Sequence, residues 1–284
     1  MRRTPLFVFC VFALSVSQLA AAQVERSGEV IAAARMALGG EARISAVKTF
    51  VANGRTRQVR GDNLVPIEFE IQVELPAKYA RRDEFPAQDA GPATSGFNGD
   101  SLIQIPAPPP QPARAGAPAP PPAQQDAILR ARVNTAKQDL ARLMLGMFAG
   151  SFPGLPVTFA YVGQAEAPQG KADVLDVKGP SNFAGRLFID SQTHLPLLLT
   201  WQAATPPPRR GGPPPQGPTA GAAPAGPPPT VEQRMYFADY RSVDGLQLPF
   251  RIRRAAGADT TEETTFDRFR INARTDPKRF EVAN

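Results

Sequence analysis

The sequence predicts a mainly β (α+β) protein built on one large antiparallel sheet of about eleven strands, with a few covering helices. Three observations carry this prediction. The last third repeats a strand–turn–strand pattern, residues 67–75 alternate strictly between apolar and polar side chains, and residues 124–148 carry a long amphipathic helical stripe.

The repeated pattern occurs at residues 185–201 and again at residues 236–252. Each copy is an apolar or aromatic run, a short polar turn and a second such run, which is the sequence form of an antiparallel hairpin. We interpret Asp190, Asp244 and Gly245 as turn formers, because Asp bonds its own backbone and Gly permits positive φ. These hairpins predict a continuous sheet.

Residues 67–75 give the clearest single strand. The apolar positions Ile67, Phe69, Ile71, Val73 and Leu75 alternate with Glu68, Glu70, Gln72 and Glu74. Successive side chains of a strand point to opposite faces, so one face is wholly apolar. We expect Phe69 and Ile71 to contact a ligand or a covering helix, and Glu70 and Gln72 to face water.

Further strands are expected from apolar and β-branched runs bounded by turn residues. They lie at residues 50–59, 78–84, 94–98, 102–105, 157–162, 172–177, 183–189 and 262–271, before a capping stretch that ends at Phe280.

Three helices are predicted. One carries Val30 to Leu38 at helical spacing and ends at Gly39-Gly40, and a short one covers residues 41–47. In the third, residues 124–148, an apolar stripe lies opposite basic side chains; it comprises Leu129, Val133, Ala136, Leu140, Met144 and Met147, opposite Arg130, Arg132, Lys137 and Arg142. We expect this helix to cover a sheet face, with binding to a membrane surface as the alternative.

Residues 1–22 have the form of a cleaved signal peptide. Arg2 and Arg3 precede an apolar core, and Ala20-Ala21-Ala22 forms a small-residue cleavage site. We expect a periplasmic chain that begins at Gln23 and has no transmembrane span. The single cysteine, Cys10, lies inside this leader and is not preceded by a lipoprotein cleavage site, so the exported chain would contain no thiol.

Two proline-rich inserts interrupt what is otherwise a single domain of residues 23–284. Residues 106–123 contain nine prolines and residues 205–229 contain eleven. Proline removes a backbone donor and fixes φ, and the inserts offer few apolar side chains to bury. We expect both to be disordered, either as inert spacers or as docking segments for a partner.

Charge and residue inventory argue against several functions. With Arg2 and Arg3 removed, 30 basic residues face 26 acidic ones, a net charge of +4 without a basic block, so nucleic-acid binding is not expected. His194 is the only histidine and sits in a turn, and no nucleophile elbow or metal-ligand spacing occurs. We therefore expect no cofactor, no metal and no enzymatic activity.

Four segments together resemble the outer-membrane lipoprotein carrier family, the LolA/LolB-like superfamily. They are Ala37-Leu38-Gly39-Gly40 with Ala46-Val47; Leu187-Phe188-Ile189-Asp190 before Leu195-Pro196; Tyr240 before Val243-Asp244-Gly245-Leu246-Gln247-Leu248-Pro249; and Phe269-Arg270-Ile271-Asn272 before Asp276-Pro277 and Phe280. The resemblance implies a strongly curved antiparallel half-barrel whose concave apolar face is closed by helices. Members bind acyl chains of lipoproteins or other hydrophobic ligands there, or act as envelope-stress sensors. The absence of a lipobox separates this chain from the anchored receptor branch.

These inferences predict a hydrophobic-ligand site between the sheet and the helix at residues 124–148. Its expected lining is Ile67, Phe69, Ile71, Val73, Leu140, Met144, Trp201 and Phe250. The expected ligand is an acyl chain or a lipidated protein. The alternative is an envelope interaction or stress-sensor protein that meets a protein partner through the proline-rich loops or the sheet surface, without carrying a ligand.

Overall fold

The structure is a computed structural model that describes residues 8–61, 63–86, 91–107, 121–167, 170–204 and 229–282. Arg2 and Arg3 of the expected leader, and most of both expected proline-rich inserts, lie outside these residues.

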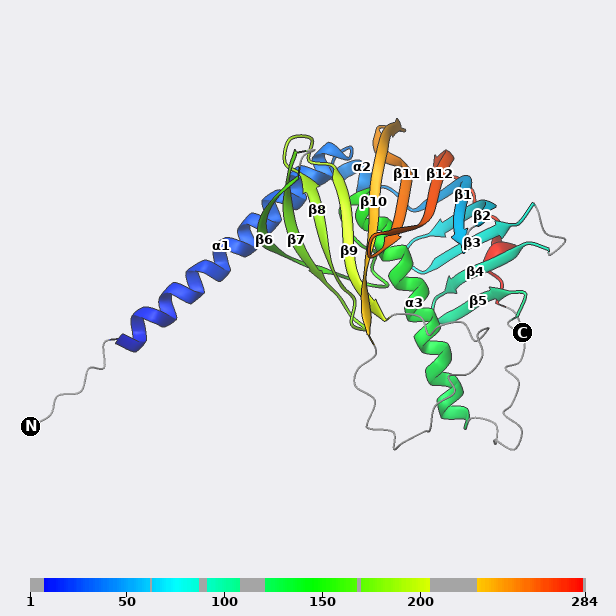
Figure 1. Cartoon of the computed structure of the whole chain (residues 1–284), viewed down its shortest axis with the longest axis horizontal. Helices are drawn as coiled ribbons and strands as arrows, with labels where there is room; N and C mark the ends of the chain where they lie inside the picture. The colour runs from blue at the N-terminus through cyan, green and yellow to red at the C-terminus, as the bar shows by residue number, and fades with distance from the viewer. Residues whose placement is uncertain are drawn as a thin grey trace, which may run out of the picture.

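In the part of the chain that the structure describes, twelve antiparallel strands form one curved sheet (Figure 1). This confirms the predicted fold class, with one strand more than the expected number. The strands are β1 (Thr49–Arg60), β2 (Asn63–Glu74), β3 (Lys78–Glu84), β4 (Ala93–Asn98), β5 (Ser101–Ile105), β6 (Thr158–Ala167), β7 (Gly170–Lys178), β8 (Ala184–Asp190), β9 (Pro196–Ala204), β10 (Thr230–Val243), β11 (Leu246–Ala256) and β12 (Asp259–Ile271). Their order is β5-β4-β3-β2-β1-β12-β11-β10-β9-β8-β7-β6, so β5 and β6 are edges and the barrel stays open.

Within the described residues, four helical segments accompany the sheet: α1 (Val8–Ala37), α2 (Glu41–Ser45), α3 (Pro122–Phe148) and the 3₁₀ turn η1 (Pro277–Phe280). Helix α1 starts well before the expected helix and packs its later turns beside β6, while its N-terminal part projects away from the sheet (Figure 1). Helix α3 begins at Pro122, two residues before the predicted start, because proline fits the first helical turn, where no backbone donor is needed.

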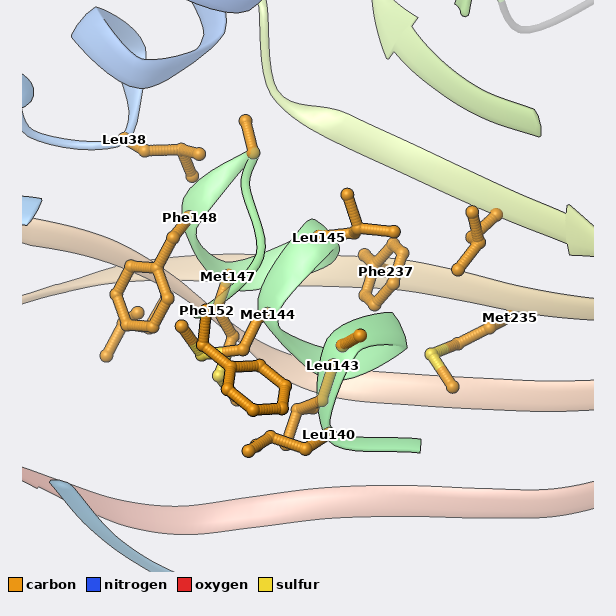
Figure 2. Packing of buried hydrophobic residues seen from close by; sticks show 14 of the residues in the cluster. Leu38, Leu140, Leu143, Met144, Leu145, Met147, Phe148, Phe152, Met235 and Phe237 are labelled. Atoms are coloured by element: carbon orange, nitrogen blue, oxygen red, sulfur yellow. The ribbon is translucent and has the colours of Figure 1, made fainter. Parts of the chain in front are cut away.

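Helix α3 crosses the concave side of the half-barrel (Figure 1). Its two halves differ in exposure to solvent. Its first turns are exposed, and Leu129 is 49% exposed despite its place on the apolar stripe. In contrast, residues 140–149 are all buried. A helix that is buried on every side must be surrounded by protein. The core of the molecule therefore lies around the last turns of α3, where Leu140, Met144, Met147 and Phe148 pack against the sheet (Figure 2).

The opposite face of β1 to β3 is covered by the segment after β12. Gln72 is only 6% exposed, and its Oε1 accepts a hydrogen bond from the backbone N–H of Asp276 at 2.8 Å. Glu70 is half-buried, and its Oε1 lies 3.4 Å from Nε of Arg279. The expectation that Glu70 and Gln72 face water is therefore wrong. Both faces of this strand are packed, one in the main core cluster and one against the C-terminal segment.

Among the described residues, no helix has the length and apolarity that crossing a membrane requires.

Candidate functional site

The structure places seven of the eight predicted site residues in the buried interior. Exposure is at most 7% for Ile67, Phe69, Ile71, Val73, Leu140, Met144 and Phe250. All of these except Ile67 belong to the main core cluster around α3, and Trp201 is half-buried at its edge. The interface between sheet and helix is thus filled by side chains along the last turns of α3.

The helix approaches the sheet closely because residue 146 is a glycine. A Cβ at Gly146 would lie 2.1 Å from the ring of Phe237 on β10, far inside ordinary contact distance. Beside it, the Tyr240 hydroxyl lies 2.9 Å from the Gly146 carbonyl and 2.8 Å from the Pro196 carbonyl, and can donate to one at a time. Burial raises the pKa of Tyr240 well above its usual value, so the hydroxyl keeps the proton that it donates.

Openings to solvent lie at both ends of the buried part of α3. The first is an apolar cleft of about 410 Å³ at the C-terminal end of α3. We call it the apolar cleft; its apolar walls are Ile44, Val47, Leu75, Pro76, Met144, Phe148, Phe152 and Pro153, and its polar lining is Arg35, Ser45, Lys48 and Ser151. Met144 is the predicted site residue that reaches this opening. Here the apolar lining of the concave face comes to the surface.

Arg35 ties together the helices that frame the apolar cleft. Its Nη1 donates to the Phe148 carbonyl at 3.0 Å, which satisfies an end carbonyl of α3, and its Nη2 donates to Glu41 Oε1 of α2 at 2.7 Å. Hydrogen bonds from Arg35 and Ser45 lower the pKa of Glu41 to about 2, so this carboxylate stays charged. Gly39 lets α1 turn into α2, because its φ of 126° suits glycine.

The other wall of the apolar cleft is the loop that follows α3. The helix ends at Phe148, and its C-cap residue Ala149 has a left-handed φ of 45°. The chain then places Phe152 against Phe97 of β4 with ring centroids 5.9 Å apart. Ser151 Oγ donates to the Leu155 carbonyl at 2.5 Å and closes the loop on itself. The wall is therefore built from local turns anchored by one aromatic contact.

The second opening, of about 460 Å³, lies under the exposed half of α3 and is polar. Its cations include Arg81, whose Nε lies 2.7 Å from Asp83 Oδ1, and Arg254, whose Nε lies 3.9 Å from Glu262. Burial disfavours the charge on Arg81, but Asp83 and Tyr79 outweigh it and raise the pKa of the guanidinium. Burial also raises the pKa of Tyr79 to about 12. The ion pairs of Arg81 and Arg254 therefore give these two cations a structural role at the polar opening.

Trp201 lies beside Arg142 of α3, away from the apolar cleft. The guanidinium carbon is 4.5 Å from the ring centroid of Trp201 and 5.5 Å from that of Phe183, while Nη1 donates to Asp139 at 2.9 Å. The sequence places Arg142 on the polar side of the helix, yet it is 9% exposed, because the half-barrel surrounds this part of α3. Its burial lowers the pKa of the guanidinium. The contact makes Trp201 a natural reporter of the position of α3.

Within the described part of the chain, no group of three or more His, Cys, Asp or Glu side chains is placed to hold a metal ion. His194 lies in the turn between β8 and β9 with a φ of 57°. Its backbone N–H donates to the Asp190 backbone carbonyl at 2.9 Å.

Sequence reasoning missed most of the apolar cleft. Ile44, Val47, Phe148, Phe152 and Pro153 were not predicted as site residues, because the walls come from separate segments. One signal was present in the sequence: Phe152, Pro153 and Leu155 are apolar residues in a segment that the pattern leaves as a loop. An apolar loop between a helix and a strand indicates contact with a core or a ligand.

Comparison with known proteins supports the fold. No protein-family model and no curated protein sequence matches the chain. Among solved structures, a LolA superfamily protein from Nitrosomonas europaea is similar at 8% identity and a TM-score of 0.53, over 90% of this chain and 97% of that one. A putative outer membrane lipoprotein-sorting protein domain from Vibrio parahaemolyticus is similar at 9% identity and a TM-score of 0.46, over 90% of this chain and 97% of that one. A DUF1329 family protein from Desulfovibrio piger is similar at 7% identity and a TM-score of 0.45, over 91% of this chain and 97% of that one. The chain therefore has a LolA-like fold.

Proposed function

We propose that the protein is an exported, non-enzymatic binding protein of the periplasm that takes a hydrophobic ligand into the apolar cleft. The ligand would be an acyl chain, free or attached to a lipidated protein. The observation that carries the proposal is the cleft itself, where the apolar concave face of a LolA-like half-barrel reaches solvent beside Met144 and Phe148.

The size and chemistry of the apolar cleft suit one acyl chain. Its volume of about 410 Å³ falls within the range of small-molecule sites. Each methylene removed from water contributes about 0.8 kcal/mol, so even a partly inserted chain gains substantial binding energy. Methionine side chains repack easily, and Met144, which lines the cleft, belongs with Met147 to the core cluster. A longer chain would advance by displacing these side chains or α3.

Binding should be measured with the delipidated exported chain, a synthetic triacylated lipopeptide and the same peptide without acyl groups. We expect saturable binding of the acylated peptide alone. Met144→Trp or Ile44→Trp, which fill the cleft, should weaken it at least about tenfold, whereas Leu129→Trp on the exposed part of α3 should leave it unchanged. Equal binding of both peptides, or no effect of either cleft variant in proteins that remain folded, would contradict the proposal.

A second candidate function is interaction with an envelope protein without ligand carriage. The observation in its favour is the dense packing of residues 140–149, which leaves the concave face filled. In this case the proline-rich segments or the sheet surface would bind the partner. Pull-downs from envelope extract with the full chain, and with both proline-rich segments replaced by short Gly-Ser linkers, would separate the two functions. A partner lost with the segments, together with no lipopeptide binding, would favour this alternative.

The periplasmic location has its own test. Sequencing the N-terminus of the exported protein should give Gln23 as the first residue. A product that keeps Cys10 would contradict cleavage after Ala22.

A further inference from the structure

A larger hollow lies on the face of the sheet that points away from α3. It has a volume of about 1010 Å³ and crosses strands β6 to β12. Met235 and Phe237 belong to the core on the α3 side, so Tyr236 between them points to the other face. By the same alternation Phe188, between the buried Leu187 and Ile189, lies on this outer face. We call this hollow the outer groove.

The floor of the outer groove is apolar and aromatic. Ala172, Phe188, Leu197, Leu198 and Tyr236 line it from four neighbouring strands, β7 to β10. Leu197 is 37% exposed, although the sequence pattern groups it with the buried Leu199. The register between β8 and β9 shifts next to Phe188 and Ile189, and this irregularity leaves both Leu197 and Leu198 in the groove. The result is an apolar strip that runs across the strands.

Two arginines stand beside this strip on the next strand, β11. Arg251 and Arg253 both line the outer groove and are exposed, and within the described residues neither has a carboxylate oxygen within 4.0 Å. The guanidinium of Arg253 lies over the Tyr236 ring, 4.2 Å from its centroid, which holds this cation against the apolar strip. Arg253 also donates a hydrogen bond to Thr260 Oγ1 at 3.4 Å, which leaves its charge unneutralised. Cations without a carboxylate partner beside an apolar floor are complementary to an anionic head on an apolar tail.

Two of the three acidic residues that line the groove are bonded to groups other than these arginines. Glu166 pairs with Lys171 at 2.6 Å, and Asp190 accepts hydrogen bonds from the backbone N–H groups of Gln192 and Thr193 in its own turn. Glu263 remains, opposite Arg253 in the ladder between β11 and β12. At the β11 end of the groove, Arg251 and Arg253 therefore face a single carboxylate, that of Glu263, and this end carries a net positive charge.

We propose that the outer groove is a second ligand site, which binds a free long-chain fatty acid with its tail along the apolar strip and its carboxylate at Arg251 and Arg253. Strands lie about 4.8 Å apart, so the strip from β7 to β10 is long enough to accept an extended chain of many methylenes. The site is separate from the apolar cleft, and the inference does not rest on the function proposed for that cleft.

The probe for the experiment is hexadecanoate that carries a photoreactive diazirine on its chain, used with the full exported protein and mapped by mass spectrometry. Its methyl ester and the alkyltrimethylammonium of equal chain length serve as head-group controls. The test variant is Arg251→Gln/Arg253→Gln. The matched control is Arg268→Gln/Arg270→Gln, which removes the same charge from exposed positions of β12 outside the groove. Leu198→Asp places a carboxylate in the apolar strip, where it disfavours an acyl tail. Thermal unfolding verifies that each variant folds.

We expect labelled peptides from β8 to β11 and an affinity for the carboxylate that falls at least about tenfold in the test variant but not in the matched control. Leu198→Asp should abolish this labelling, whereas Met144→Trp should leave it intact. Labelling confined to α2, α3 or the loop after α3 would overturn the inference, because the fatty acid would then occupy only the apolar cleft. Equal binding of the ester or the ammonium compound, or equal effects of the two arginine variants, would also overturn it.

Discussion

Replacing Gly146 by alanine tests whether α3 packs into the half-barrel as closely as the structure shows. Two effects oppose each other. In an open helix the change stabilises by up to about 1 kcal/mol, because alanine has the higher helix propensity. At Gly146 the new Cβ would lie 2.1 Å from one atom of the Phe237 ring and 2.4 Å from two others. The ring would have to retreat by about 1.3 Å to reach an ordinary contact of 3.4 Å.

The steric effect should win. Overpacking a core typically costs about 1–3 kcal/mol, and here the bulky ring is itself 3% exposed and cannot move freely. After a helix gain of about 1 kcal/mol is subtracted, we expect Gly146→Ala to lower the free energy of unfolding by up to about 2 kcal/mol. Denaturant unfolding measures it. Gly28→Ala is the matched control, because Gly28 lies in α1 with open space around it and should not destabilise the protein.

A double-mutant cycle with Phe237→Ala isolates the contact. The single Phe237→Ala change should cost about 3–5 kcal/mol as a large core truncation. In that background Gly146→Ala should become neutral or stabilising, since the ring it strikes is gone. If Gly146→Ala stabilises the wild-type protein as well, or costs the same in both backgrounds, then α3 does not pack against β10 at this point and the description of the interface is wrong.

Two further substitutions test the other packed regions. Glu70→Lys should lower the free energy of unfolding by about 1–2 kcal/mol, because it places a cation beside Arg279 and removes half-buried hydrogen bonds, whereas the exposed Glu68→Lys on the same strand should change it by no more than about 0.5 kcal/mol; equal effects in chemical denaturation would argue against the C-terminal cover. The pKa of Glu41 is lowered to about 2 by Arg35, so its contribution to stability is present above the unfolded value of 4.5 and is lost as pH falls from there toward 2. Thermal unfolding between these pH values should show a smaller acid dependence for Glu41→Gln, and an unchanged slope would contradict the role of this pair.

The sheet could be predicted because its signal is local. The alternation of Phe69, Ile71 and Val73 identifies a strand with one apolar face, and this face does pack into the core. The helical spacing of Leu140 and Met144 likewise predicts a helix that covers the sheet. Periodicity depends only on neighbours in sequence, so it can be recognised without knowledge of the fold.

The burial of polar side chains on β2 and α3 could not be predicted, because segments distant in sequence cover them. Gln72 looks solvent-facing in its strand but is covered by Asp276, some two hundred residues later. Arg142 sits on the polar side of its helix yet is surrounded, because the half-barrel closes around the end of α3. No local pattern encodes which strand curves over which helix.

The apolar cleft and the outer groove fall outside sequence reasoning for a related reason. The cleft combines residues from α2, the end of β2, α3 and the following loop, and the groove needs a register shift between β8 and β9. A β-bulge changes which face a residue such as Leu197 occupies, and strict alternation assigns it to the wrong side. Sites of this kind become visible only after the strands are paired.

The most direct test of the proposed binding function is a crystal structure of the exported protein grown with the triacylated lipopeptide. We expect continuous density for an acyl chain in the apolar cleft, between Met144 and Phe152, with the side chain of Met144 displaced and the sheet unchanged. A fully bound lipopeptide whose acyl chains lie elsewhere, with Met144 and Phe148 packed as in the free protein, would contradict it.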